Sequence, residues 1–240
     1  MASITYFLLF LFALAPSLVW LAFYLRKDAH PEPNGMIVRI FLLGMLSAIP
    51  AIFIETFLEG FLSALPFSQI GFLLVYFVLG IALVEEFLKY LVVRFGVFSN
   101  SALDEPLDFM LYMIIAALGF AAFENVILLF GLIQTYLASD VFLVNAIRFV
   151  QAVLLHALAS GLLGYFLALS FLQKKHRGFL FILGLAFSTL LHGLFNFYIF
   201  TAGGQGPLFL FLPLIPLFGI AVFISFEFRN LKKLWDKKLQ

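Results

Sequence analysis

The chain has 240 residues, of which 64% are hydrophobic and 11% are charged, and its formal net charge is +1. A mean hydropathy of +1.13 lies far from the balance of a soluble globular domain, so we expect the chain to fold in a lipid bilayer. The small net charge gives no reason to expect nucleic acid as a partner. The lack of cysteine excludes disulfides, thiolate metal sites and cysteine nucleophiles.

Seven apolar segments are long enough to cross a bilayer as helices, which takes about 20 residues each. In chain order they cover residues 4–25, 37–62, 71–94, 107–131, 141–172, 179–200 and 207–226. The first segment has no basic flank before it, so we interpret it as a retained helix and not as a signal peptide. The sequence therefore predicts an all-α, polytopic membrane bundle of about seven helices, which forms a single domain over residues 1–240.

Positive charge is distributed unevenly over these segments. If the N-terminus lies outside, all 14 basic residues except Lys89 and Arg148 fall at cytoplasmic ends of the predicted helices. This is the distribution that the positive-inside rule requires. The predicted orientation is therefore N-out and C-in.

Polar and ionisable side chains occur inside four of the predicted spans. A charge at mid-bilayer costs about 2.5–3.5 kcal/mol, so each of these groups needs an explanation. They are Glu85, Glu86, Lys89, Glu124, Asn125, Arg148, His156, Ser160, His192 and Asn196. We favour a shared site as the explanation, because three Glu, one Lys and two His on four spans exceed what helix packing alone would need.

Helical spacing organises the charged residues of the third span. At about 100° per residue, Glu85, Glu86 and Lys89 share one face, with the ammonium between the two carboxylates. Two adjacent carboxylates in a low-dielectric site do not both ionise easily, and such a pair suits acid–base chemistry.

Two further pairs have i,i+4 spacing, namely His156 with Ser160 and His192 with Asn196. Small residues continue the same helix faces, which predicts close helix contacts. These small residues are Ala157, Gly161, Gly164, Ala168, Gly184 and Ser188.

Several polar residues also have simpler explanations when they are taken singly. Asn125 and Ser160 could be hydrogen-bond partners between helices. We interpret Arg148 as structural, paired with Glu55 or Glu59 of the second span.

Residues near the start of the fourth span also have an ordinary explanation. Asp104, Glu105 and Asp108 are interpreted as a solvated helix start, where acidic groups complement the helix dipole. Phe120, one turn before Glu124, is interpreted as a packing residue.

The ordered set of motifs resembles that of the PrsW family of bacterial intramembrane proteases. In that family the motifs read EExxK, FxxxEN, a His in the following helix and HxxxN. The matching segments are Glu85-Glu86-Phe87-Leu88-Lys89, Phe120 to Asn125, His156 to Ser160 and His192-Gly193-Leu194-Phe195-Asn196. The stretch from Asp28 to Gly35, with Pro31-Glu32-Pro33, resembles the first cytoplasmic loop of the family. The resemblance covers residues 26 to 200.

This resemblance implies an intramembrane endopeptidase of the cytoplasmic membrane that cuts a single-pass membrane protein of the anti-sigma-factor type. It also implies a set of site residues. The catalytic set is Glu85, Glu86, Glu124, His156 and His192, and the supporting set is Lys89, Asn125, Ser160 and Asn196. The family is similar to the CAAX prenyl endopeptidases, which have a His where this chain has Glu124, so the role of Glu124 stays open.

The chemistry of peptide hydrolysis agrees with that set, because it needs a base for water, an acid for the leaving amine and a donor to the oxyanion. We assign Glu86, or alternatively Glu85, as the base, with His156 orienting the water. His192 and Asn196 would then face the oxyanion.

A zinc ion is the main mechanistic alternative, because His156, His192 and Glu86 could hold it and leave a position for water. The sequence lacks the compact HExxH arrangement, so we favour glutamic chemistry without a cofactor. Two other functions also stay open. Glu and His chains build proton relays in transporters and channels, although no internal repeat is visible, and a non-catalytic scaffold could use the same network for packing.

Overall fold

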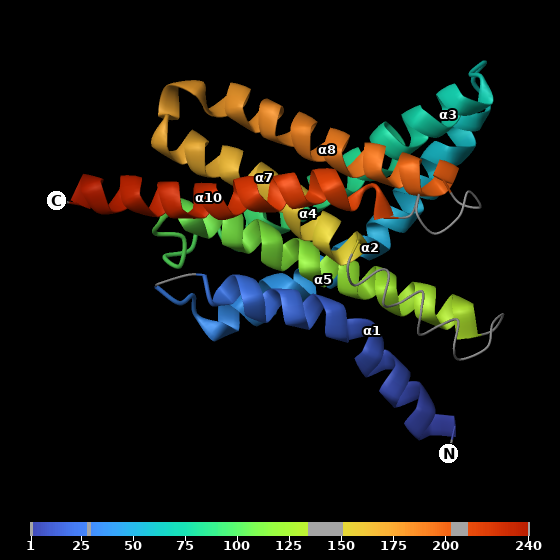
Figure 1. Cartoon of the computed structure of the whole chain (residues 1–240), viewed down its shortest axis with the longest axis horizontal. Helices are drawn as coiled ribbons and strands as arrows, with labels where there is room; N and C mark the ends of the chain where they lie inside the picture. Colours follow the sequence, from blue (N-terminus) through green and yellow to red (C-terminus); the bar gives the residue numbers. More distant parts are fainter. Residues whose placement is uncertain (1, 28–29, 134–150, 203–210, 240) are drawn as a thin grey trace.

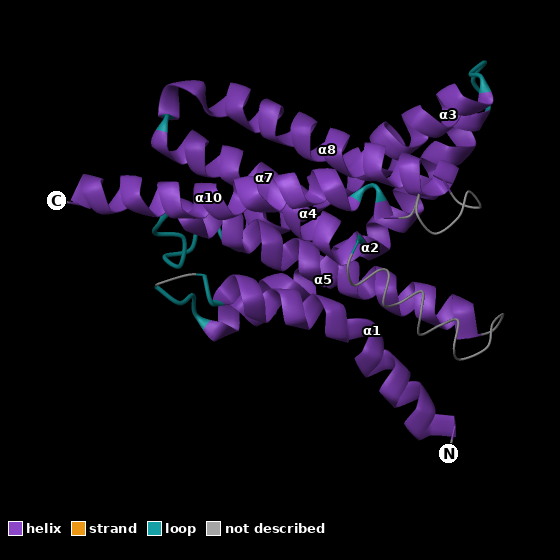
Figure 2. Cartoon of the chain, in the orientation of Figure 1, coloured by secondary structure: helices purple, strands orange, loops and turns teal. Residues whose placement is uncertain are grey.

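The computed structural model describes residues 2–27, 30–133, 151–202 and 211–239, which form the bundle in Figure 1. In this part of the chain there are helices and connecting loops but no strand (Figure 2). The elements are α1 (Ala2–Leu25), α2 (Asn34–Ser63), α3 (Gln69–Val75), the π-helix η1 (Tyr76–Ala82), α4 (Leu83–Gly96), α5 (Pro106–Ile133), α7 (Ala152–Leu172), the 3-10 turn η2 (Lys174–His176), α8 (Arg177–Ala202) and α10 (Leu214–Leu239).

Six of the described helices are long and apolar enough to cross a bilayer, and α1 contributes a shorter apolar stretch, Phe10–Leu25. α3, η1 and α4 form one continuous crossing, Gln69–Gly96. The predicted all-α polytopic bundle is thus confirmed. The last helix differs from its predicted range, because it begins at Leu214 and continues to Leu239. Residues 141–150 of the predicted fifth span lie outside the described residues.

α5 occupies the centre of the bundle (Figure 1) and packs against α1, α2, α4, α7 and α10. Its residues from Leu107 to Ala122 are buried on every side. The large apolar side chains of the outer helices face outward instead, and Phe57 of α2 and Phe218 of α10 are both 72% exposed. An apolar exterior of this kind is what a bundle solvated by lipid requires.

Glycines bring the helix backbones close together around α5. Gly119 of α5 packs on the carbonyl of Phe41 in α2. A Cβ atom added at Gly164 of α7 would lie 2.6 Å from the Cα of Met110 in α5. The close contacts predicted from small residues therefore occur at Gly164, where a side chain would push the two helices apart.

α1 contains Pro16 and bends near its middle (Figure 1). Proline lacks a backbone N–H and kinks a helix. The side-chain amide of Asn125 in α5 donates to the carbonyl of Ala13 near the bend, at 3.3 Å. Asn125 therefore ties α5 to α1.

The start of α5 is buried, and the expectation of a solvated helix start was wrong for Asp108, which is 2% exposed. Its Oδ2 accepts the backbone N–H groups of Asp104 (2.9 Å) and Glu105 (2.7 Å). Its carboxyl group also lies in the electrostatic field of Glu32, whose Oε2 accepts the hydrogen of the Tyr112 hydroxyl at 2.5 Å. The loop before α2 covers this helix start and excludes water from it. We call Glu32, Asp108 and Tyr112 the end cluster.

The C-terminal end of α1, the turn between α7 and α8 and the C-terminal end of α10 lie at the same end of the bundle (Figure 1). These are the places where the sequence puts most of its basic residues. Helices that cross a bilayer in alternating directions produce this arrangement. The N-out, C-in orientation stays a prediction.

Candidate active site

Three helices bring polar side chains together in the interior of the bundle. α4 contributes Glu85, Glu86 and Lys89, α7 contributes His156 and Ser160, and α8 contributes Ser188 and His192. Each of these residues is at most 3% exposed. Ligand-type atoms of the two glutamates and the two histidines lie within 4.8 Å of one another. We call these seven residues the buried cluster.

Lys89 lies at the centre of the buried cluster. Its Nζ donates to Glu85 Oε2 at 3.0 Å, to Glu86 Oε1 at 2.8 Å and to His156 Nδ1 at 2.9 Å. The Phe120 ring lies 4.4 Å from the same nitrogen. An ammonium group has three N–H donors and no acceptor, so all its protons are used and the Nδ1 atom of His156 must be an acceptor.

Glu86 is held by four hydrogen bonds. Its Oε1 accepts from Lys89 and from Nδ1 of His192 at 2.9 Å. Its Oε2 accepts from the hydroxyls of Ser160 at 2.6 Å and Ser188 at 3.0 Å. Both oxygens are therefore occupied and the carboxylate is fixed in place. Because Nδ1 of His192 donates, a neutral His192 ring carries its free lone pair on Nε2.

Glu85 is held more loosely than Glu86. Among the described residues it accepts a hydrogen bond from Lys89 alone. Its Oε2 lies 3.7 Å from Nδ1 of His156 and 3.7 Å from Nε2 of His192. These distances are too long for direct hydrogen bonds, and a water molecule beside them could contact both partners.

Glu124 of α5 lies at the edge of the buried cluster. Its Oε2 is 2.7 Å from Nε2 of His156. Because Nδ1 of His156 accepts from Lys89, Nε2 carries the proton and faces this oxygen of Glu124. The side chain of Glu124 is 31% exposed, whereas that of His156 is 4% exposed. Glu124 thus orients His156 from the side of the cluster that is open to its surroundings.

Other residues from the sequence analysis have different positions. Asn196 of α8 lies one turn after His192, is half-buried and forms no hydrogen bond within the described part of the chain. Asn125 makes the bond to α1 described above. Arg148 lies outside the described residues, so its pairing with Glu55 or Glu59 is not tested.

Two residues near the site, Glu55 and Ser188, were not among the expected site residues. Glu55 of α2 lies in the electrostatic field of Glu85, Glu124 and Lys89, and its Oε1 atom is buried without a hydrogen-bond partner in the described structure. The position of Glu55 near these charges could not be predicted from residue spacing, because α2 carries none of the motif residues. The signal for Ser188 was present, since it lies one turn before His192 on the same helix face.

A change of helix type precedes Glu85 and helps to position α8. The π-helix η1 ends three residues before Glu85, and π-helical turns are frequent at functional sites. Gly193, next to His192, packs on η1 so closely that an added Cβ would lie 2.6 Å from the Cα of Val78. This contact lets the backbone of α8 approach the helix that carries Glu86, so that His192 can reach it.

Comparison with known proteins identifies the family of this chain. A model described as "PrsW family intramembrane metalloprotease" matches residues 32–224. The chain belongs to the PrsW family of intramembrane proteases. It is 33% identical to Protease PrsW of Geobacillus kaustophilus (strain HTA426) over 185 residues, which are 76% of this chain and 75% of the relative. No solved structure matches it.

Two further relatives agree with this assignment to the PrsW family. Protease PrsW of Oceanobacillus iheyensis is 31% identical over 184 residues, which cover 77% of this chain and 79% of the relative. Protease PrsW of Bacillus subtilis (strain 168) is 29% identical over 186 residues, with the same coverage of 77% and 79%.

The family's description as metalloproteases raises the question of whether the buried cluster could bind a metal ion. Glu85, Glu86, His156 and His192 fit a divalent ion by donor type and by mutual distance. Lys89, however, hydrogen-bonds three of these four residues, including the Nδ1 atom of His156. A bound ion that used this nitrogen would require Lys89 to leave its position.

Proposed function

We propose that this chain hydrolyses a peptide bond of a membrane-anchored protein with a water molecule held beside Glu85. The proposal rests on the different hydrogen bonding of the Glu85 and Glu86 carboxylates. Glu86 has both oxygens occupied by four hydrogen bonds, whereas Glu85 has one such bond among the described residues and faces two imidazoles at 3.7 Å. A general base needs a lone pair within reach of the water proton. The geometry therefore favours Glu85 as the base, and Glu86 as the group that fixes Lys89 and His192.

In the proposed reaction, Glu85 takes one proton from water and the water oxygen bonds to the carbonyl carbon of the substrate. The carbonyl oxygen becomes an oxyanion, which His192 and Asn196 would face, with the side-chain amide of Asn196 donating a hydrogen bond to it. When the carbon–nitrogen bond breaks, Glu85 returns its proton to the leaving nitrogen. One water molecule is consumed, and no other reactant is needed.

Lys89, His156 and Glu124 would position Glu85. The Lys89 ammonium lies 3.0 Å from Glu85 and is held on its other side by His156, which Glu124 orients in turn. A buried carboxylate keeps its charge when an opposite charge lies within hydrogen-bond distance. In this mechanism Glu124 is a positioning residue. The sequence alone had left its role open.

The substrate class follows from the family and from the location of the cluster. The buried cluster is enclosed by helices long and apolar enough to cross a membrane, so a substrate must reach it from the bilayer or its interface. We propose a single-pass membrane protein of the anti-sigma-factor type as the substrate. We also propose that the single domain over residues 1–240 lies in the cytoplasmic membrane, N-out and C-in.

The family's description as metalloproteases favours a second version of the mechanism. A divalent ion such as zinc would be held by Glu85, Glu86, His156 and His192, where it would supply Lewis-acid activation of water. We favour the version without metal because Lys89 already bonds both carboxylates and His156.

The test uses purified protein in liposomes together with candidate single-pass substrates from the same genome. We expect Glu85→Gln to lower the cleavage rate about 10²–10⁴-fold, which is the usual contribution of a general base. Glu227→Gln on α10 is the matched control, because Glu227 bonds Asn230 and lies outside the buried cluster. Cleavage by Glu85→Gln at the wild-type rate would exclude Glu85 as the base.

The same liposomes separate the other functions. A wild-type protein that leaves every candidate substrate whole, and instead moves protons into liposomes that contain a pH-sensitive dye, would be a transporter. A scaffold would do neither. Loss of cleavage with a membrane-permeant chelator, reversed by zinc, would replace the metal-free mechanism with the metal-dependent one.

A further inference from the structure

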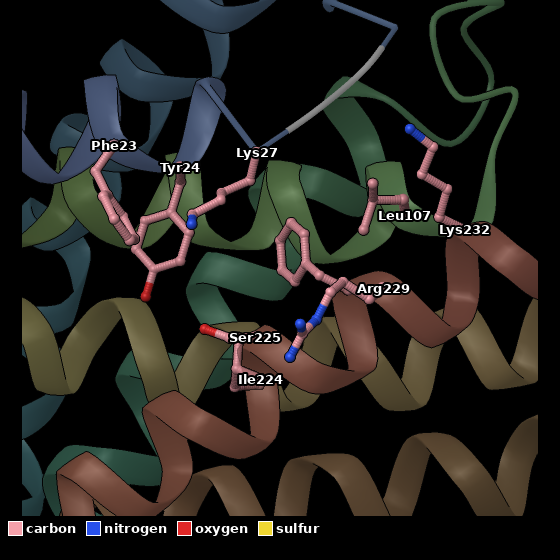
Figure 3. A pocket seen from close by; sticks show the side chains of 9 residues that line it. Phe23, Tyr24, Lys27, Leu107, Ile224, Ser225, Arg229 and Lys232 are labelled. Atoms are coloured by element: carbon pink, nitrogen blue, oxygen red, sulfur yellow. The ribbon is translucent and has the colours of Figure 1, made fainter.

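A second candidate site lies away from the buried cluster, at the end of the bundle that carries the C-terminus. It is a pocket of about 320 Å³ between α1 and α10, with α5 beneath it (Figure 3). α1 and α10 are far apart in the sequence, and both pack on α5. The Tyr24 and Phe228 rings, 6.4 Å apart, join the two helices beside the pocket.

The polar half of the pocket is basic. Lys27 lies in the turn directly after α1, and Arg229 and Lys232 come from α10. Figure 3 shows the side chains of Lys27, Ser225 and Arg229 directed toward the same space, with Lys232 further along the rim. This pocket therefore gathers three positive charges and a hydroxyl group.

No described carboxylate lines the pocket. The nearest acidic residue along α10, Glu227, is directed elsewhere. It accepts a hydrogen bond from Asn230 at 3.4 Å and interacts electrostatically with the Tyr165 hydroxyl of α7. The positive charge of the pocket is therefore not balanced from within the described structure, and an anion would be attracted to it.

The other half of the site is apolar. Phe23 and Leu107 line the pocket itself. A neighbouring hollow of about 550 Å³ shares Phe23 and Lys27 with it, is also lined by the basic residue Arg26, and continues along α1 past Val19 and Ala22. Val19, Ala22 and Phe23 have the spacing of one helix face, so an apolar strip leads from the basic rim toward the middle of α1.

We propose that this pocket binds the phosphate headgroup of an anionic phospholipid, with an acyl chain along the apolar strip of α1. Basic pockets between membrane helices on the cytoplasmic side are suited to such headgroups, and an arginine fork matches a phosphate group well. A free phosphate would use only the basic rim, whereas a phospholipid uses both halves of the site. The bound headgroup joins α1 to α10 and thereby stabilises the outer helices around α5.

The test measures lipid retention by native mass spectrometry after the protein is extracted from bilayers that contain equal amounts of phosphatidylglycerol and phosphatidylcholine. Wild type is expected to retain phosphatidylglycerol. Each basic residue removed should weaken retention about fivefold, which corresponds to the usual contribution of a Lys or Arg near an anionic lipid surface. The variants are Lys27→Gln, Arg229→Gln and Lys232→Gln, singly and together.

The matched control removes three basic residues at the same end of the bundle but outside the pocket, Lys174→Gln, Lys175→Gln and Arg177→Gln. We expect this control to change retention less than twofold. Circular dichroism checks the helix content of every variant. If the triple variant fails to fold, the proposal is tested with the single variants. Arg229→Lys should lose less retention than Arg229→Gln, because it keeps the charge and loses only the guanidinium fork.

Four results would overturn the proposal. The first is equal retention of phosphatidylglycerol and phosphatidylcholine by wild type, and the second is an equal loss in the control. The third is complete displacement of the lipid by inorganic phosphate, which would show that the apolar strip contributes nothing. The fourth is pocket-dependent binding of a soluble acidic peptide where phosphatidylglycerol does not bind, which would make the partner a protein segment.

Discussion

The buried cluster and the end cluster each bring two carboxyl groups together in the protein interior, but they stabilise them differently. In the buried cluster, Glu85 and Glu86 share the ammonium of Lys89. In the end cluster, Asp108 accepts the backbone N–H groups of Asp104 and Glu105, and Glu32 accepts the hydrogen of the Tyr112 hydroxyl.

The comparison shows that a buried pair of acids does not by itself indicate catalysis. The carboxyl groups of the end cluster accept hydrogen bonds from donors that the fold holds in place, namely backbone amides and a tyrosine. The cluster therefore fastens a loop to α5. Glu85 instead faces two imidazoles at 3.7 Å, and an imidazole is the side chain best suited to exchange protons near neutral pH. A poorly satisfied acceptor beside proton carriers is the feature that separates the two sites.

The largest effect is expected from Lys89→Met, which removes the only cation of the described buried cluster and leaves two carboxylates without it. Breaking a buried ion pair on one side costs about 3–5 kcal/mol. We expect a corresponding loss of stability, measured by thermal unfolding in detergent, together with loss of cleavage.

Arg94→Met is the control for Lys89→Met, because Arg94 is an exposed basic residue of the same helix. Its stability should change by less than about 0.5 kcal/mol. If Lys89 acts by compensating Glu85, adding Glu85→Gln to Lys89→Met should restore part of the lost stability. A Lys89→Met protein as stable as wild type would show that the carboxylates do not depend on this cation.

The fold was predictable because lipid imposes a simple rule. Every backbone group in hydrocarbon needs a partner, so each long apolar segment becomes a helix, and α2 and α5 begin and end close to the residues that hydropathy indicates. The grouping of Glu85, Glu86 and Lys89 was also predictable, because they lie on one helix and their separation depends on helical geometry alone.

Contacts between helices were less predictable, because sequence spacing carries no information about which helices become neighbours. The approach of Glu55 to Glu85 depends on how α2 crosses α4, and no residue pattern encodes this crossing. The roles of Glu85 and Glu86 depend on the hydroxyls of Ser160 and Ser188, which both bond Glu86. Burial of Asp108 depends on a loop that folds over it, although its own sequence context is that of an exposed helix start.

The next effect concerns the position of His192. Gly193→Ala adds a Cβ atom where the Cα of Val78 lies 2.6 Å away, so α8 must shift away from η1. A displacement of about 1 Å at a catalytic group can lower a rate about 10²-fold, and we expect a loss of that size in kcat.

Gly219→Ala is the matched control, since an added Cβ there meets no atom within 4 Å. Its cleavage rate should be unchanged, and its stability should be equal or slightly higher because alanine favours the helix. Equal rates for Gly193→Ala and wild type would show that the close contact between α8 and η1 is not needed to place His192.

A smaller effect is expected from Ser188→Ala, which removes one of two hydroxyl donors to Glu86 Oε2. A hydrogen bond to a charged group contributes about 1.5–3 kcal/mol, and we expect the lower end of this range because Ser160 remains. Thermal unfolding measures the loss. Ser63→Ala on α2, an exposed serine that bonds only its own helix, is the control, and a loss as large in this control would show that Ser188 has no special part in holding Glu86.

The smallest effect, and the one that separates the two clusters most directly, is expected from Tyr112→Phe. This change removes the hydroxyl that donates to Glu32 at 2.5 Å and keeps the buried ring, so stability should fall by about 0.5–1.5 kcal/mol. The cleavage rate should stay within twofold of wild type, since the end cluster would only fasten the loop before α2. Tyr165→Phe, which removes a hydroxyl that interacts with Glu227, gives the matched change on another helix. The contrary outcome is that Tyr112→Phe lowers cleavage as strongly as Glu85→Gln while Tyr165→Phe does not. The end cluster would then take part in the reaction, and the distinction between a reactive and a structural pair of acids would be wrong.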